Sequence, residues 1–248
     1  MNGLARFTMA LTVTGTITLL AQSDDARRQL APGGTLRAGL NTNNRLTTAV
    51  GRELATELAR RLGVEASFVE YPSPGAVIDG VGKEWDLAFV AADPAREAAT
   101  AFTDPYVEIE ATYLVRGDSP IRDVDDIDRD GVRVATGATS AYTLVMKREL
   151  RHASLVFAGG EDALARLRSG EVDAVAALRD VLVRSVAMVP GSRVLPGNIT
   201  RAQQAVAVPK ANGAALAYVA SFLADVKASG FLEQSIRKTA FIGASIPR

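Results

Sequence analysis

Asp93 and Arg96 are the residues of this chain best suited to hold a small ion, and they lie three positions apart in Asp93-Pro94-Ala95-Arg96. The apolar run 87–90 just before them predicts a buried strand. Because open α/β sheets bind ligands at the carboxyl ends of their strands, an arginine delivered there is placed to hold an anion. An arginine two residues after a proline is also typical of an exposed helix start, so these four residues leave both interpretations open.

Further polar residues follow the first predicted strand, residues 36–41. Asn41 ends that strand, and Asn44 closes the polar cluster just beyond it. By the same rule about strand ends, both amides are candidate ligand contacts.

The first half of the chain alternates between predicted strands and helices. Leucines at i, i+4 and i+8 indicate a helix from about 49 to 62, and a glycine directly beyond ends it. Strand 66–71, a short helix near 77–81 and strand 85–90 follow. This β-α-β-α-β order predicts a parallel sheet with right-handed crossovers.

The second half repeats this pattern. Residues 132–137 resemble the first strand. Residues 164–176 then repeat the order of residue types in 78–89, in which apolar residues are followed by a glycine, an aspartate and an apolar run. The gap from the glycine to the aspartate is one residue shorter in the second half. A predicted helix at 142–150 and a predicted strand at 155–157 lie between them. The sequence therefore predicts a second α/β lobe whose sheet is separate from the first.

Two strand-like stretches, 108–115 and 205–208, are predicted to cross between the lobes. A long helix at 214–230 then returns the chain to the first lobe. Two crossings predict a hinge with a cleft beside it.

Composition excludes several classes of function. Among 248 residues, Lys plus Arg and Asp plus Glu both number 28, so no net field attracts nucleic acid. The absence of cysteine excludes disulfides, thiolate metal sites and cysteine nucleophiles. The single histidine, His152, is expected at an exposed helix end, and the acidic run 123–130 lacks the glycine and final glutamate of a calcium loop. No dinucleotide fingerprint or phosphate loop is present either, so we expect no metal and no cofactor.

Residues 1–23 have the pattern of a secretory signal. One positive charge at Arg6 precedes the uncharged stretch 7–21, which is shorter than the about 20 apolar residues of a membrane span. Ala21-Gln22-Ser23 is a small-x-small cleavage site, so we expect export to the periplasm. The alternative is an N-terminal extension on a cytoplasmic protein.

In order and spacing, several segments resemble the bacterial extracellular solute-binding proteins of family 3, periplasmic receptors that deliver polar amino acids and similar solutes to ABC importers. The resemblance covers about residues 33–238, and the segments that carry it are 36–39, 58–63, 85–88, 93–96, 102–106 (Phe-Thr-Asp-Pro-Tyr) and 137–140. It implies the α/β, type II periplasmic-binding-protein-like fold, with two parallel-sheet lobes joined by two hinge crossings. Lobe 1 is expected at 33–114 and 200–248, and lobe 2 at 115–199. A monomer with a membrane permease as partner is also implied.

The resemblance further implies roles for named residues. Arg96 matches the family arginine whose guanidinium forks onto the ligand carboxylate, a geometry that lysine does not reproduce. Ala138, Thr139 and Ser140 match the segment whose backbone N–H groups, at a helix start in the second lobe, bind the same carboxylate.

The chain departs from the family pattern around the ligand's amino group. Leu178, followed by Arg179, occupies the position of the family aspartate that takes that group, and Asp93 replaces the threonine of the arginine motif. Asp93 either takes over the amine or pairs with Arg96, and Arg179 either faces the cleft or points outward into a salt bridge. We therefore expect a ligand richer in negative charge or poorer in amine than a neutral amino acid, such as a carboxylate or dicarboxylate. The loop after the first strand also lacks the aromatic residue that often stacks on the ligand.

Two other functions stay open at this point. A few members of the fold resemble cyclohexadienyl dehydratase, an enzyme that needs a cleft acid to protonate a leaving hydroxyl, and Asp93 or Asp180 is the candidate. A ligand-sensing domain is the other, favoured if residues 1–23 are retained.

Overall fold

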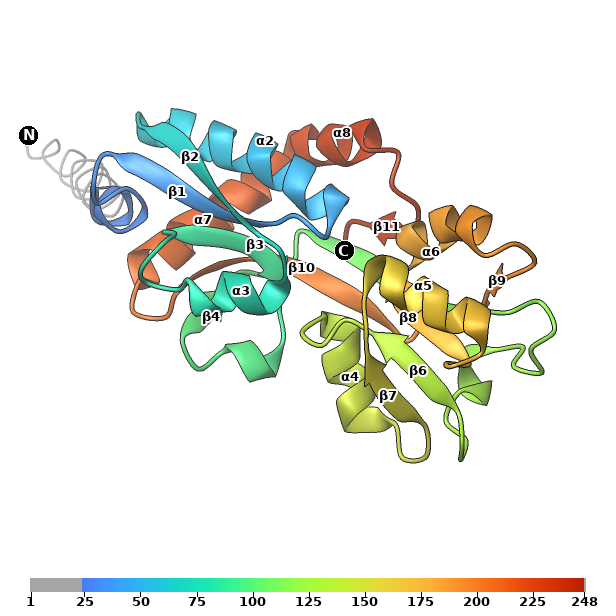
Figure 1. Ribbon diagram of the computed structural model, residues 1–248. Helices are drawn as coiled ribbons and strands as arrows, with labels where there is room; N and C mark the ends of the chain where they lie inside the picture. Colours follow the sequence, from blue (N-terminus) through green and yellow to red (C-terminus); the bar gives the residue numbers. More distant parts are fainter. Residues whose placement is uncertain (1–23, 248) are drawn as a thin grey trace, which may run out of the picture.

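The computed structural model describes residues 24–247, so the predicted signal at 1–23 lies outside the described residues. Strands and helices alternate along most of this range and gather around two groups of parallel strands (Figure 1). We call the group built on β1, β2 and β3 lobe 1, and the group built on β6, β7 and β8 lobe 2.

Lobe 1 begins with three parallel strands in the order β2-β1-β3. Its elements are β1 (Thr35–Asn41), α2 (Arg45–Leu62), β2 (Glu65–Tyr71), α3 (Pro74–Asp79) and β3 (Leu87–Ala91). The helix α2 begins four residues earlier than its leucines predict, because the Asn44 side chain accepts a hydrogen bond from the Thr47 N–H and caps it.

Lobe 2 repeats the arrangement, with β8 and β7 pairing in parallel on either side of β6. Its elements are β6 (Arg133–Thr136), α4 (Ala141–Glu149), β7 (Ser154–Phe157), α5 (Gly160–Ser169), β8 (Ala174–Leu178) and α6 (Arg179–Ser185). The helix α6 has no counterpart among the predicted elements.

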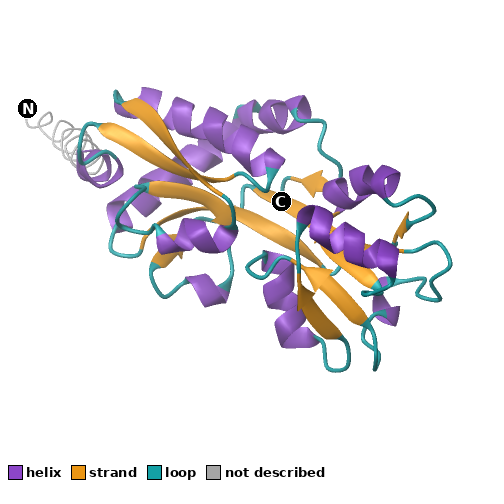
Figure 2. Cartoon of the chain, viewed as in Figure 1, coloured by secondary structure: helices purple, strands orange, loops and turns teal. Residues whose placement is uncertain are grey.

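Two long strands, β5 (Val107–Val115) and β10 (Thr200–Pro209), connect the lobes as predicted. β10 pairs antiparallel with β3 and β5, and β5 pairs antiparallel with β8. The ladder of hydrogen bonds therefore runs unbroken in the order β2-β1-β3-β10-β5-β8-β6-β7. Figure 2 shows long strands passing between the two lobes. The expectation of two separate sheets was wrong, because each crossing strand hydrogen-bonds along both of its edges.

The apolar cores of the two lobes are nevertheless largely separate, although Leu178 of β8 belongs to the main lobe 1 cluster. In β3, Leu87 and Phe89 join the cluster that contains the leucines of α2, whereas Ala88 and Val90 join the cluster under α3. In lobe 2, Met146 of α4 and Leu167 of α5 belong to two further clusters on opposite faces of β6 and β8. Each lobe therefore has its own helix–sheet–helix core, while the lobe boundaries stay a prediction.

The C-terminal segment returns to lobe 1 and then to the crossing strands. The elements are α7 (Gly213–Ala228), α8 (Phe231–Lys238) and β11 (Ala244–Ser245), which pairs with β5. Gly230, at φ 76°, turns the chain between the two helices, so the single helix predicted at 214–230 is followed by a second one. Short elements complete the described chain: β4 (Thr100–Phe102), β9 (Arg193–Val194) and the 3-10 helices η1 (Pro94–Arg96), η2 (Val124–Asp126) and η3 (Val186–Met188).

Among residues 24–247, a membrane-spanning length and apolarity is reached by no single helix; the pair α7 and α8 reaches it only jointly, across a 76° bend.

Candidate ligand-binding site between the lobes

A pocket of about 760 Å³ lies between the two lobes. Its lining residues come from the carboxyl ends of β1, β3, β6, β7 and β8 and from the helices that follow β6, β7 and β8. This is where open α/β sheets place their ligands, and the volume suits a small organic molecule.

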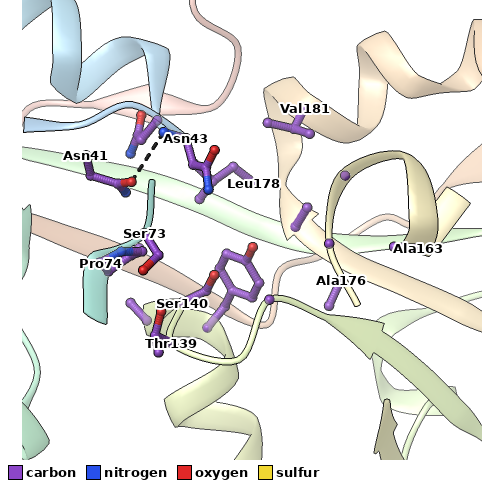
Figure 3. Close-up of a pocket in the computed structure, with 18 of the residues that line it drawn as sticks. Asn41, Asn43, Ser73, Pro74, Thr139, Ser140, Ala163, Ala176, Leu178 and Val181 are labelled. Carbon is purple, nitrogen blue, oxygen red and sulfur yellow. Dashed lines mark hydrogen bonds between the residues drawn. The ribbon is translucent and has the colours of Figure 1, made fainter. Parts of the chain in front are cut away.

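The lobe 1 wall is polar and uncharged. Asn41, Asn43 and Asn44 line it, together with Ser73 and Pro74 at the start of α3. The Asn43 backbone N–H donates to Oδ1 of Asn41 at 3.2 Å, a bond that Figure 3 draws. The two asparagines predicted from the sequence, Asn41 and Asn44, thus both line the pocket.

The lobe 2 wall opposite is the segment that joins β6 to α4. Ala138, Thr139 and Ser140, all predicted site residues, line the pocket together with Tyr142. Ser140 is the N-cap of α4 but makes no capping hydrogen bond with its side chain. Ala141 and Tyr142, the first residues of α4, also line the pocket, so the positive end of the helix dipole lies at the pocket wall, which favours an anion.

Tyr142 adds an aromatic side chain to the pocket lining. Burial raises the pKa of its phenol, so the hydroxyl stays neutral and able to donate.

The far end of the pocket is apolar. In Figure 3, Ser73, Thr139 and Ser140 gather at one end, and Ala163 and Val181 lie at the other. Further apolar lining residues come from α5, β8 and α6: Leu164, Val175, Ala176, Ala177, Leu178 and Leu182. The pocket is therefore polar toward the α3 and α4 starts and apolar toward α5 and α6.

No Asp, Glu, Lys, Arg or His stands among the lining residues in the part of the chain that the structure describes. The predicted charged site residues Arg96, Asp93 and Arg179 therefore lie outside the lining.

Arg96 lies directly behind the pocket wall. It is 5% exposed, its Nη2 donates to the Thr139 carbonyl at 2.7 Å, and its Nη1 donates to the Ala91 carbonyl. Both of those acceptor residues line the pocket. Burial lowers the pKa of the guanidinium from its usual value, and the charge of Asp93 opposes this shift. Arg96 is thus not an exposed helix-start residue, and it joins lobe 1 to lobe 2.

Asp93 pairs with lobe 2 and not with Arg96. Its Oδ2 accepts from Nη1 of Arg148 on α4 at 3.1 Å, and its Oδ1 caps η1 by accepting from the Ala95 N–H at 2.9 Å. The Asp93 carboxylate is nearly buried, whereas the Arg148 side chain is 50% exposed.

Arg179 points away from the pocket. Its Nε donates to Oε2 of Glu110 on β5 at 2.7 Å, and its other donors reach the carbonyls of Leu195 and Gly197. Of the two orientations left open by the sequence, the structure has the outward salt bridge. Leu178, one residue earlier, does line the pocket.

Sequence reasoning missed five polar lining residues: Asn43, Ser73, Tyr142, Ser185 and Gln204. Ser73 follows β2, so the strand-end rule that selected Asn41 would have found it. Gln204 precedes the apolar run of a predicted crossing strand, and Tyr142 stands two residues after Ser140 at a helix start.

The model of one protein family matches this chain. That family is the bacterial extracellular solute-binding proteins, family 3, and the match covers residues 48–240.

Solved structures of similar architecture include the P235GK mutant of ArgBP from T. maritima, at 25% identity and a TM-score of 0.70, covering 86% of this chain and 98% of that one. AbpA from Streptococcus pneumoniae, bound to L-arginine, is 22% identical with a TM-score of 0.70, covering 84% and 95%. The ancestral amino acid-binding protein AncCDT-1, a precursor of cyclohexadienyl dehydratase, is 23% identical with a TM-score of 0.71, covering 86% and 97%.

Proposed function

Since this chain belongs to the bacterial extracellular solute-binding proteins of family 3, we propose that it captures a small carboxylate-bearing solute between its lobes and delivers it to an ABC importer. The proposal includes export by residues 1–23, action as a monomer in the periplasm, and a membrane permease as partner. AbpA, a structural neighbour, has L-arginine bound and is named as an amino acid ABC transporter substrate-binding protein.

The observation that carries the proposal is the meeting of Arg96 and the start of α4 at one end of the pocket. Nη2 of Arg96 reaches the Thr139 carbonyl at 2.7 Å, next to the uncapped N–H groups of α4. A cation from lobe 1 and a helix N-terminus from lobe 2 are thus close together, and both favour a carboxylate.

We assign Arg96 as the residue that holds the ligand carboxylate. In the structure its two hydrogen bonds go to neutral carbonyl oxygens. A carboxylate offers the guanidinium an opposite charge and two oxygens in the geometry of its parallel N–H groups, which two separate neutral carbonyls do not. A carboxylate entering this end of the pocket would therefore displace the Thr139 carbonyl as the partner of Arg96, and the α4 N–H groups would bind its second oxygen.

A thermal-shift screen of small carboxylates and amino acids tests the proposal. Because a ligand that binds only the folded state stabilises it by mass action, a ligand at about 100 times its Kd adds roughly 2.7 kcal/mol. We expect at least one carboxylate to raise the melting temperature, and neutral sugars and polyamines of similar size to leave it unchanged. A screen in which only sugars or polyamines stabilised the protein would refute it.

The dehydratase alternative has less support. Asp180 is fully buried, and hydrogen bonds from Arg45 and Arg184 outweigh the effect of burial and hold its pKa well below the usual value. An ionised carboxylate held by two arginines has no proton to give to a leaving hydroxyl. Asp93 is likewise held by Arg148, and neither acid lines the pocket. Incubation with prephenate or arogenate, followed by product analysis, tests this alternative directly.

A further inference from the structure

We infer that the ligand is an organic acid without an ammonium group, such as a 2-hydroxy or 2-oxo acid with an apolar body. This inference rests on the proposed function and narrows its solute class. It starts from the charge of the pocket wall, to which the described lining residues contribute four amide side chains, several hydroxyls and no carboxylate.

The buried acids close in sequence to the lining residues are already paired, and the two acids of the first α5 turn, Glu161 and Asp162, are exposed and do not line the pocket. Asp93, two positions after Ala91, binds Arg148 at 3.1 Å. Asp180, next to Val181, binds Arg45 at 2.8 Å and Arg184 at 3.0 Å. An ammonium group in this pocket would therefore lose its water without gaining a free carboxylate.

The desolvation of an ammonium group has a large free-energy cost. Moving an ammonium ion from water into a protein interior costs several kcal/mol unless an opposite charge is close. Carbonyl and amide oxygens recover part of this cost but not the Coulomb attraction of a carboxylate. Arg96 and the α4 N-terminus add positive potential at the same end of the pocket, which repels a cation further.

A neutral substituent next to the carboxylate suits the same wall. Asn41, Asn43, Ser73 and Ser140 offer groups that donate or accept hydrogen bonds, so they can bind a hydroxyl or an oxo oxygen equally well. The remaining part of the ligand would lie toward Val181, where the lining is apolar and transfer from water is favourable.

Matched sets of acids test the inference by calorimetry. Each set keeps the carbon skeleton and changes only the substituent on C2: leucine, 2-hydroxy-4-methylpentanoate and 4-methyl-2-oxopentanoate form one, and phenylalanine, phenyllactate and phenylpyruvate another. We expect the hydroxy or oxo acid to bind at least about tenfold more tightly than the amino acid of its set, because one desolvated ammonium is absent. Arginine and lysine should bind more weakly still.

A substitution at Leu178 gives an independent test. Leu178 lines the pocket at the end of β8, so Leu178→Asp adds a carboxylate to the wall, and Leu178→Asn adds the same shape without charge. We expect Leu178→Asp, but not Leu178→Asn, to shift the preference toward the amino acid by at least about tenfold. If the two variants fail to fold, the matched sets on the unmodified protein still decide.

The outcomes separate this inference from the proposed function. If an amino acid equals or exceeds its hydroxy and oxo analogues, or if arginine or lysine binds best, the inference fails while the proposed function stands. If no acid of any set and no other carboxylate or amino acid binds, both fail.

Discussion

Arg45 at the start of α2 donates two hydrogen bonds to the buried carboxylate of Asp180 at the start of α6, 2.9 Å from Nε and 2.8 Å from Nη2. This pair joins lobe 1 to lobe 2 next to the C-terminal segment. Arg45 also donates to the carbonyls of Thr239 and Ala240, and Asp180 accepts from the Ile242 N–H at 3.0 Å. The C-terminal segment is therefore fastened to both lobes through one ion pair.

Asp180→Asn should lower the free energy of unfolding by about 2 kcal/mol, because it removes a buried carboxylate that accepts charge-assisted hydrogen bonds from two half-exposed guanidinium groups. Asp180 is fully buried and accepts from both Arg45 and Arg184. Urea denaturation followed by circular dichroism measures the change. The control is Glu233→Gln, which breaks an exposed pair with Arg237 on α8 and should cost less than about 0.5 kcal/mol. Equal effects of the two substitutions would contradict a structural role for Asp180.

The same carboxylate predicts an acid-dependent loss of stability. Burial tends to raise the pKa of Asp180, but hydrogen bonds from Arg45 and Arg184 outweigh it, so the folded-state pKa lies below the usual value. The stabilisation is therefore fully present above about pH 4, the pKa of an unfolded aspartate, and is lost as the pH falls toward the folded-state pKa. The difference in melting temperature between wild type and Asp180→Asn should shrink below about pH 4. A difference that stays constant down to pH values near 2 would show that Asp180 is not the titrating group.

Arg148→Gln should weaken ligand binding by a factor of about 2 to 5 with little change in stability, because Arg148 is half exposed and its pair with Asp93 exists only while the lobes are together. The effect should become smaller at high salt, which screens the half-exposed Arg148 end of the pair. Calorimetry at low and high salt checks both expectations. Arg60→Gln is the control, since Arg60 pairs with Glu57 on the same helix, within lobe 1. If Arg148→Gln lowers the affinity no more than Arg60→Gln does, the Arg148–Asp93 pair does not help to hold the two lobes together around the ligand.

Gly75 lets the start of α3 approach lobe 2 closely. Its N–H donates to Oγ1 of Thr139 at 3.3 Å, and a Cβ on Gly75 would lie 2.8 Å from Cγ2 of that residue. Gly75→Ala should therefore weaken binding by about five- to tenfold by lowering the fraction of molecules with closed lobes. Gly213→Ala, where the new Cβ has no atom within 4 Å, should leave binding unchanged.

Removal of the opposing methyl group tests the cause of the Gly75 effect. Thr139→Ser deletes Cγ2 and keeps the hydroxyl, so the double variant Gly75→Ala, Thr139→Ser should recover most of the affinity measured for Thr139→Ser alone. If the affinity losses of Gly75→Ala and Thr139→Ser simply add in the double variant, the clash with Cγ2 of Thr139 is not the cause of the Gly75→Ala effect.

The sequence predicted the elements that position the site because their signals are local. Leucine spacing in α2 and the apolar run of β3 are properties of short windows, and strand ends in an α/β sheet converge by topology. Asn41 could be assigned to the cleft on that basis, whereas Thr139 was assigned to it through the resemblance to family 3, and both line the pocket.

The side-chain partners could not be predicted in the same way. Arg45 and Asp180 stand 135 positions apart, and nothing near Arg45 in the sequence indicates which of many acids it meets. The outward direction of Arg179 depends on Glu110 of a crossing strand, which lies beside α6 only after both lobes have formed. The continuous ladder depended on both edges of β10 being paired, which composition does not encode.

Arg96→Ala and Arg96→Lys should both weaken binding of a carboxylate ligand by about 2 to 5 kcal/mol, because each leaves a desolvated anion without its bidentate partner. The melting temperature should change little. Removal of the guanidinium takes away hydrogen bonds to the Ala91 and Thr139 carbonyls, but it also removes a buried cation whose hydrogen bonds are not to a carboxylate.

Parallel calorimetry and thermal unfolding separate the two effects. Arg52→Ala is the matched control, because Arg52 pairs with Glu70 on the outside of lobe 1 and does not line the pocket. If Arg96 holds the ligand, only the Arg96 variants lose affinity, and Arg96→Lys does not restore it because a lysine ammonium lacks the planar pair of donors. A ligand that bound wild type and Arg96→Ala equally well would make Arg96 a structural link between the lobes, and the carboxylate would then depend on the N–H groups of α4 alone.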